Sequence, residues 1–174
     1  FPMEYFKKRL EPILDAFVEK YGKAPLFKSE PGRYCVAEGS VILGRVHAVK
    51  QNAGVKYAGT DIGMNVLVRP SMYDSWHDVE ILRNGKVVER KELQEITVVG
   101  NICESGDIIA KNRQLPEMKV GDLACVLDTG AYGYSMCSTY NSRPRPAEVL
   151  IGKDGSLKVI RRKATLEDLF RYFE

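Results

Sequence analysis

The first part of the chain has apolar residues at intervals of three and four, the spacing of one face of an α-helix. The series comprises Phe6, Leu10, Ile13, Leu14, Phe17, Val18 and Tyr21. It predicts an amphipathic helix over residues 3–21, ended by Gly22, because glycine readily closes a helix C-terminus. Pro12 interrupts the pattern. Since proline has no N–H donor, we expect it to kink or restart the helix.

A short apolar run over residues 26–29 predicts a strand that ends at the turn Glu30-Pro31-Gly32-Arg33, and one or two helical turns are expected from there to about Ser40. A helix, a short loop, a strand and a polar turn follow one another in this way in β/α barrels, whose sites lie at the C-terminal ends of the strands. We therefore interpret residues 1–40 as the last α/β elements of a TIM barrel.

From residue 41 onward, short β-rich runs alternate with glycine turns. The predicted strands cover residues 41–49, 55–60, 66–69, 79–83, 86–89, 95–99, 123–128, 148–151 and 157–161. Hairpin turns are predicted at 83–85 and 153–155, and Thr165 is expected to cap a short final helix. Many short strands with almost no helix predict a mainly β fold, an antiparallel β-sandwich or barrel over residues 41–174.

Composition excludes several classes. The chain is 44% hydrophobic and 28% charged with a net charge of +3, which is ordinary for a globular protein. The short basic runs, 7–9 and 161–163, are interpreted as solvated surface, so no nucleic-acid partner is expected. No apolar stretch is long enough to cross a bilayer.

The four cysteines have no C-x-x-C spacing, which predicts reduced thiols, a cytoplasmic location and no structural zinc site. Because the chain opens inside a helical pattern, we expect it to be the C-terminal part of a longer polypeptide.

The turn at Glu30-Pro31-Gly32-Arg33 carries chemistry suited to a phosphorylated pyridine. A carboxylate at a strand end can keep a ring nitrogen protonated, and an arginine beside a glycine N–H can hold a phosphate. The alternative is a strand-ending turn with a local ion pair.

Downstream, Arg69 and Tyr73 can bind a carboxylate together; the alternative is a surface arginine beside a half-buried tyrosine. Cys103 lies in a polar, glycine-bounded loop, where it can act as a general acid or nucleophile, and Glu104 can bind an ammonium group. Tyr132, between Gly130 and Gly133, can reach a phosphate.

Among the remaining residues of these types, we interpret Cys35, Cys125 and Cys137 as packing residues. His47 and His77 are interpreted as structural or surface residues.

Taken together, the motifs resemble the diaminopimelate decarboxylase family. They occur in the order Glu30–Arg33, Asp61–Asn65, Arg69–Tyr73, Cys103–Asp107, Gly130–Gly133 and Tyr140–Glu148. The resemblance covers about residues 26–170. It implies an alanine-racemase-like C-terminal β-domain preceded by the end of a barrel, pyridoxal 5′-phosphate as cofactor, and decarboxylation of meso-diaminopimelate to lysine.

The resemblance also implies roles for single residues. Glu30 would pair with the pyridine nitrogen, Gly32 and Arg33 would hold the phosphate, and Arg33 and Tyr132 would also lie near the substrate. Arg69 and Tyr73 would bind the distal carboxylate and Glu104 the distal ammonium of the substrate. Cys103 would donate a proton, with Cys103 and Glu104 supplied across the interface of a homodimer.

The sequence departs from the family's pattern in one large respect. The lysine that binds the cofactor in this family, and its glycine-rich phosphate loop, are not identifiable here, so residues 1–174 alone are expected to be inactive without an N-terminal barrel portion. Two alternatives remain: a sister decarboxylase acting on another diamino or D-amino acid, and a non-catalytic regulatory relative.

Overall fold

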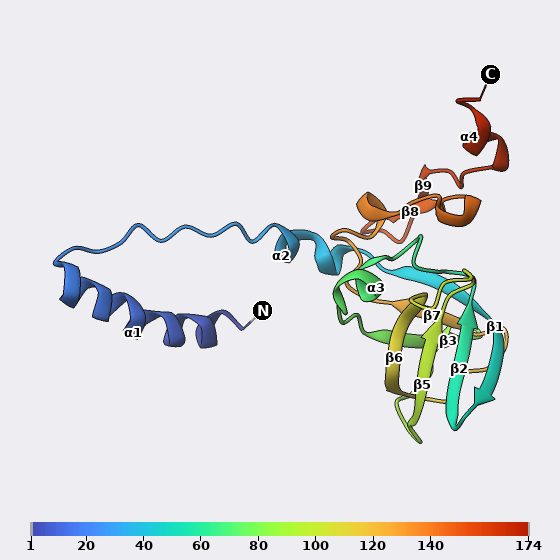
Figure 1. The fold of residues 1–174 in the computed structure, drawn as a ribbon, viewed down its shortest axis with the longest axis horizontal. Helices are drawn as coiled ribbons and strands as arrows, with labels where there is room; N and C mark the ends of the chain where they lie inside the picture. The colour runs from blue at the N-terminus through green and yellow to red at the C-terminus, as the bar shows by residue number, and fades with distance from the viewer. Residues whose placement is uncertain (1, 174) are drawn as a thin grey trace. The chain divides into compact units, whose positions relative to one another are not determined.

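The computed structural model describes residues 2–173 and divides the chain into two units, residues 1–35 and 36–174 (Figure 1). The first unit contains helix α1, Met3–Tyr21, as predicted. Gly22 ends it in the left-handed conformation with φ of 70°, and its N–H donates to the Val18 carbonyl at 2.8 Å. The helix continues through Pro12 rather than restarting there.

The prediction of a strand over residues 26–29 is wrong, because residues 24–31 form no regular secondary structure. A strand needs a neighbour for its backbone hydrogen bonds, and no described strand pairs with this segment. Phe27 packs instead near Phe6, with ring centroids 6.4 Å apart. The expected helical turns follow as α2, Gly32–Val36, and the 3₁₀ turn η1, Ala37–Gly39.

The second unit is built on a seven-stranded sheet with the strand order β4-β3-β7-β1-β2-β5-β6 (Figure 1). Its strands are β1 (Ile42–Asn52), β2 (Val55–Thr60), β3 (Val79–Arg83), β4 (Lys86–Val87), β5 (Gln94–Val99), β6 (Ile108–Leu115) and β7 (Leu123–Val126). The mainly β fold is therefore confirmed. The sheet is mixed rather than purely antiparallel, because β2 and β5 run parallel.

Two elements differ in kind from the predicted strands, whereas one predicted hairpin is confirmed. Residues 66–69, predicted as a strand, form a turn that leads into helix α3, Arg69–Tyr73. Strand β6 was not predicted at all. The hairpin at 83–85 is confirmed, because Arg83 pairs with Lys86 across Asn84 and Gly85, both of which have positive φ.

A separate two-stranded sheet, β8 (Glu148–Ile151) with β9 (Leu157–Arg161), follows the main sheet along the chain. Helix α4, Leu166–Phe170, is the last helix of the described residues. As expected, Thr165 caps it: the Thr165 hydroxyl accepts from the Asp168 N–H, and the Asp168 carboxylate accepts from the Thr165 N–H.

The core of the second unit is aliphatic and lies against the main sheet. Its fully buried side chains include Val46, Leu67, Ile81, Val98, Ile109 and Val126. Burial of each such side chain contributes about 1.5–3 kcal/mol. The core therefore fixes the sheet from which the loops described below extend.

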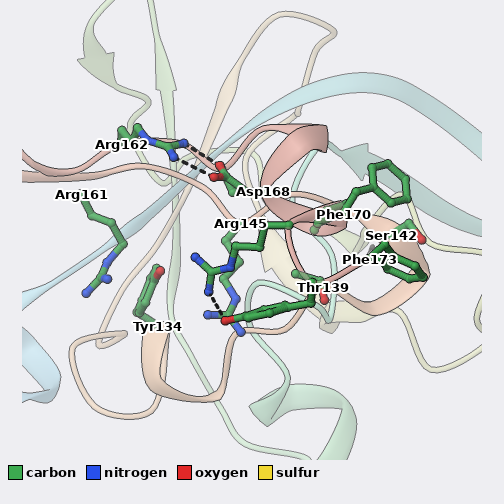
Figure 2. Close-up of a pocket in the computed structure, with 13 residues that line it drawn as sticks. Tyr134, Thr139, Ser142, Arg145, Arg161, Arg162, Asp168, Phe170 and Phe173 are labelled. Carbon is green, nitrogen blue, oxygen red and sulfur yellow. Dashed lines mark hydrogen bonds and ion pairs between the residues drawn. The ribbon is translucent and has the colours of Figure 1, made fainter.

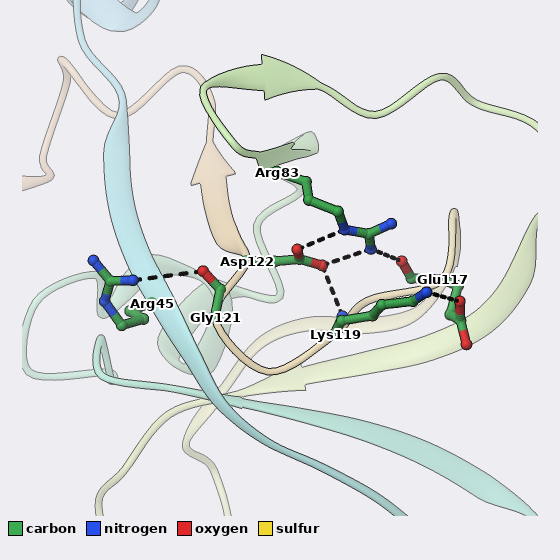
Figure 3. A network of polar contacts seen from close by, with 6 residues as sticks. All are labelled: Arg45, Arg83, Glu117, Lys119, Gly121 and Asp122. Carbon is green, nitrogen blue, oxygen red and sulfur yellow. Dashed lines mark hydrogen bonds and ion pairs between the residues drawn. The ribbon is translucent and has the colours of Figure 1, made fainter.

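One buried ion pair ties β3 to the start of β7 (Figure 3). The Arg83 guanidinium donates to both Asp122 oxygens at 2.8 Å, and the Lys119 N–H donates to Oδ2 at 2.7 Å. Desolvation opposes ionisation of Asp122, but these hydrogen bonds outweigh it, so the pKa of Asp122 lies below its ordinary value.

Candidate functional site

Asp107 holds together the loop that carries Cys103 and Glu104. Its side chain is buried; Oδ2 accepts from the Ile102 N–H at 2.7 Å and Oδ1 from the Met64 N–H at 2.6 Å. The Asp107 N–H in turn donates to the Glu104 carbonyl at 3.0 Å. Two of the sequence motifs, 61–65 and 103–107, are therefore joined through one carboxylate.

Gly100 is needed where this loop begins. A Cβ there would overlap the Asp107 carboxylate and come within 2.5 Å of the Gly63 Cα. Only a residue without a side chain lets the two loops approach so closely. Helix α3 adds a further tie, because the Ser71 hydroxyl donates to the Gly106 carbonyl at 2.5 Å.

On this anchored loop the side chains of Cys103 and Glu104 are exposed. Each side chain has one hydrogen bond within the described residues, and both donors belong to the last of the motifs, residues 140–148. The Asn141 amide donates to Cys103 Sγ at 3.3 Å, and the Tyr140 hydroxyl donates to Glu104 Oε2 at 3.4 Å. The fold therefore brings the 103–107 and 140–148 motifs together.

Arg69 opens α3 and is 8% exposed. One of its terminal nitrogens donates to the Ser75 hydroxyl at 3.1 Å, and no carboxylate of the described residues pairs with it. The interpretation of Arg69 as a surface residue is thereby excluded. A buried guanidinium that keeps unused donors is suited to bind an anion.

Two tyrosine rings lie beside this guanidinium. The Arg69 carbon Cζ is 5.7 Å from the Tyr73 ring centroid and 5.1 Å from that of Tyr132. Both tyrosines are about half exposed, at 58% and 45%. The structure thus assembles Arg69 and Tyr73 of α3 with Tyr132 of the 130–133 turn, and their chemistry suits a carboxylate with an apolar chain.

Tyr132 is held in an unusual backbone conformation, with φ of 63°. Such a conformation costs a non-glycine residue roughly 1 kcal/mol, so the surrounding turn must hold it in place. The turn is fixed by its neighbours, since the Thr129 N–H donates to Ser40 and the Gly130 N–H to Ala37, at 3.0 and 2.9 Å.

The predicted cofactor residues Glu30 and Arg33 belong to the first unit. Both side chains are exposed and pair with no described residue, so an ion pair between them is not formed. A Cβ at Gly32 would meet no atom within 4 Å, which leaves its backbone open to a ligand. A free carboxylate, a free guanidinium and an open glycine backbone fit a phosphorylated pyridine by their donor chemistry.

The other cysteines differ from Cys103. Cys125 and Cys137 are buried, and desolvation raises the pKa of both thiols, so they remain protonated packing residues as predicted. Cys35 is exposed, and its interpretation as a packing residue is wrong.

A cavity of about 640 Å³ lies elsewhere in the second unit, between η2 (Tyr134–Met136), β9 and α4 (Figure 2). None of the predicted site residues lines it. Two of its arginines are engaged, because Arg162 pairs with Asp168 and Arg161 pairs with Glu148 while covering the Tyr134 ring. We therefore assign it no part in the site.

Within residues 2–173, no helix is long and apolar enough to span a membrane. The same residues contain no group of three or more His, Cys, Asp or Glu side chains arranged to hold a metal ion.

Comparison with known proteins agrees with this fold. Residues 33–143 match the family model described as the pyridoxal-dependent decarboxylase, C-terminal sheet domain. The chain therefore belongs to the pyridoxal-dependent decarboxylase family.

Two of the similar relatives are named diaminopimelate decarboxylase. Diaminopimelate decarboxylase from Methanothermobacter thermautotrophicus is 41% identical over 173 residues, which are 97% of this chain and 39% of the relative. The enzyme of that name from Archaeoglobus fulgidus is 50% identical over 141 residues, 80% of this chain and 32% of the relative.

A solved structure of diaminopimelate decarboxylase from Helicobacter pylori complexed with L-lysine has a TM-score of 0.72 and 38% identity. The match covers 82% of this chain and 34% of that one. This chain thus spans about a third to two-fifths of the length of the relatives it matches.

The sequence patterns assign no role to Asp107, Tyr140 or Asn141, although all three lie in the motifs on which the family resemblance rests. A signal for Asp107 was present, since an aspartate between glycine-rich loops is suited to accept backbone N–H groups.

Proposed function

We propose that this chain is the C-terminal portion of a diaminopimelate decarboxylase, which converts meso-2,6-diaminopimelate to L-lysine and carbon dioxide. Two lines of support come from the relatives: several carry this name at 41–50% identity, and one is complexed with L-lysine. The observation that carries the proposal in this chain is the buried Arg69, which lacks an acidic partner among the described residues and lies between two tyrosines.

Arg69 would bind the carboxylate at the far end of the substrate, with Tyr73 and Tyr132 beside it. Glu104 would bind the distal ammonium group. An amino acid that lacks these distal groups would leave the buried guanidinium unpaired, which is costly, so the pocket selects for a diamino dicarboxylate.

Pyridoxal 5′-phosphate, when bound, supplies the electron sink that accepts the electron pair left when carbon dioxide departs. In this chain Glu30 would face the ring nitrogen, while Gly32 and Arg33, and Tyr132 at its own turn, would hold the phosphate. The unpaired side chains of Glu30 and Arg33 and the open backbone of Gly32 support this assignment.

Cys103 would then complete the reaction. Loss of carbon dioxide breaks a C–C bond and leaves an electron pair at Cα, which must gain a proton. A thiol in an exposed, anchored loop can carry that proton to the substrate. We infer that Cys103 is this acid.

The assembly is also part of the proposal. We infer that residues 1–40 complete a barrel supplied by an N-terminal portion of the protein, that residues 41–174 form the β-domain, and that the protein acts as a cytoplasmic homodimer in which Cys103 and Glu104 serve the partner's site. The short share of each relative that the chain covers supports the existence of a further portion.

The test is carbon dioxide release by the full-length parent protein with pyridoxal phosphate. meso-Diaminopimelate, lysine, ornithine and arginine are offered separately, and we expect turnover of meso-diaminopimelate alone. Turnover of lysine, ornithine or arginine instead would move the substrate to a sister decarboxylase. Cofactor binding without any turnover would indicate a regulatory relative.

A further inference from the structure

The turn formed by residues 140–143 contacts both side chains of the Cys103–Glu104 pair, and the proposed reaction assigns it no task. We propose that Asn141 and Tyr140 are positioning residues: Asn141 fixes the Cys103 thiol as proton donor, and Tyr140 fixes the Glu104 carboxylate for the substrate ammonium. This inference rests on the proposed function, which gives Cys103 and Glu104 their roles.

The Asn141 contact orients the thiol in a useful way. The amide N–H donates to Cys103 Sγ at 3.3 Å, so the sulfur acts as the acceptor and its own S–H remains free to be given away. Backbone hydrogen bonds of Gly100 and Asp107 hold the loop but reach no atom of the thiol. Within the described residues, Asn141 is therefore the side chain that sets the direction of the thiol.

The backbone conformation of Asn141 favours this contact. Asn141 and Ser142 both have left-handed conformations, with φ of 54° and 55°. Asparagine tolerates this conformation better than most L-residues. The turn is held at both ends, because the Arg143 guanidinium donates to the Asn101 carbonyl at 2.7 Å and the Ser138 N–H donates to the Asn65 carbonyl at 2.8 Å.

The Tyr140 contact is longer and acts on a different group. The Tyr140 hydroxyl donates to Glu104 Oε2 at 3.4 Å, and the Tyr140 N–H is fixed by the Ser138 hydroxyl at 3.3 Å. Glu104 has no ion pair within the described residues, so this hydroxyl is what restrains its carboxylate. Two adjacent residues thus serve two groups, one for proton transfer and one for substrate binding.

This division predicts separate kinetic signatures. Loss of the Asn141 donor should lower kcat and spare KM, since the acid acts only in the chemical step. Loss of the Tyr140 hydroxyl should raise KM and spare kcat, because the distal ammonium is bound equally before and during the reaction. A residue that only supported the turn would change both constants together.

The experiment uses the full-length parent protein with pyridoxal phosphate and meso-diaminopimelate. Asn141→Gly removes the amide while allowing the left-handed backbone, and Asn141→Asp keeps the size but not the donor. We expect kcat to fall about tenfold in both, with KM within twofold. The control Ser142→Gly changes the neighbouring left-handed residue, and we expect it to leave both constants unchanged.

Tyr140→Phe removes only the hydroxyl. We expect KM for meso-diaminopimelate to rise about threefold, as suits a long hydrogen bond, with kcat unchanged. Wild-type kcat in Asn141→Asp, or equal changes of kcat and KM in the variants of both residues, would overturn the proposal.

A second measurement does not depend on turnover. Cys103 and Cys35 are both exposed, so alkylation by iodoacetamide, resolved by peptide mass spectrometry, gives a rate ratio within one molecule. Freeing the sulfur in Asn141→Gly should raise the Cys103-to-Cys35 ratio about threefold, and Ser142→Gly should not change it.

An unchanged ratio in Asn141→Gly would overturn the Asn141 contact. Failure of the proposed function would give a different result. The wild-type parent protein would then release no carbon dioxide, while the labelling ratio would still change in Asn141→Gly.

Discussion

Asp107 and Arg69 are both buried and charged, yet their surroundings differ. Asp107 directs its two oxygens to backbone N–H groups of two loops, so its charge is satisfied inside the fold. The Arg69 guanidinium contacts one serine hydroxyl and two tyrosine rings, but no anionic group among the described residues. The first pattern is typical of a structural residue, and the second indicates a ligand.

For Asp107 we predict a loss of stability. In Asp107→Asn one of the two backbone N–H groups would face an amide N–H instead of an oxygen. The free energy of unfolding of the full-length protein, measured in urea, should fall by about 2 kcal/mol. The control Asp128→Asn changes an exposed aspartate and should stay within about 0.5 kcal/mol. Equal effects of the two substitutions would contradict the anchoring role.

For Arg69 we predict a loss of substrate binding. Arg69→Ala should raise KM for meso-diaminopimelate by at least about tenfold, because the distal carboxylate loses a charge-assisted partner. Steady-state kinetics of the full-length protein measure this change. Arg9→Ala, at an exposed arginine of α1, serves as the control. An unchanged KM in Arg69→Ala would remove the carboxylate-binding role.

The residues with reactive side chains in glycine-bounded loops could be chosen as candidates from the sequence, because residue type and turn chemistry are local signals. Asn141 was not assigned a role, since its importance depends on a left-handed backbone and on a contact with a residue far away along the chain. Nor does any local pattern reveal that Arg69 is buried between two tyrosines.

At the scale of elements, strands with regular alternation were predicted well, and β2, β3, β8 and β9 have the expected limits. Strand β6 was missed because its alternation is broken. Asn112 adopts a positive φ of 48° within the strand, and Arg113 occupies a buried position, where its guanidinium stacks on Trp76 and donates to the His77 carbonyl. From the sequence alone, an arginine in a strand is expected at the surface, because the partners that allow its burial are far away along the chain.

The irregularity at Asn112 leads to a prediction about β6. The Asn112 N–H donates to the Thr97 hydroxyl at 3.1 Å, and that hydroxyl donates to Asn112 Oδ1 at 3.0 Å. Asn112→Val should destabilise the protein by about 2 kcal/mol, since a β-branched residue resists positive φ. Asn112→Gly should cost less than about 1 kcal/mol. Denaturant unfolding of both variants measures the difference, and equal losses would contradict this explanation.

The link between β3 and β7 gives a prediction about pH. Because the pKa of Asp122 is lowered in the folded protein, its stabilising effect is complete above its ordinary pKa of 3.8 and is lost as the pH falls through the folded value. Below about pH 4 the wild type should therefore lose more stability than Asp122→Asn. Urea midpoints between pH 7 and 2.5 test this. Glu117→Gln, at an exposed carboxylate paired with Lys119, should keep the wild-type pH dependence.

At the scale of the whole molecule, two surfaces are rich in exposed apolar side chains. Helix α1 has no buried residue, although Phe6, Ile13 and Phe17 lie on it. Both strands of the β8–β9 sheet expose aliphatic residues, among them Ile151, Leu157 and Val159. Surfaces of this kind are usually covered in a stable protein, which agrees with the proposal that a barrel portion and a second copy complete the assembly.

The proposed homodimer can be tested by mixing inactive subunits. If Arg69 serves one site and Cys103 the partner's site, a heterodimer of Arg69→Ala and Cys103→Ala has one intact site. Co-expression of the two full-length variants should then restore about a quarter of wild-type activity, because random pairing makes about half of the dimers mixed. Activity no higher than that of either variant alone would mean that each site is built within one subunit.

Strand β1 joins two parts of the main sheet, because it pairs with β2 on one side and with β7 on the other. Its residues from Val46 onward pair with β2, which follows at once, but residues 42–45 pair with β7. During synthesis residues 42–44 must wait without these strand partners until residues 123–126 have left the ribosome. A ribosome that stalls before Leu123 should therefore release a nascent chain with an open strand edge, which is prone to self-association.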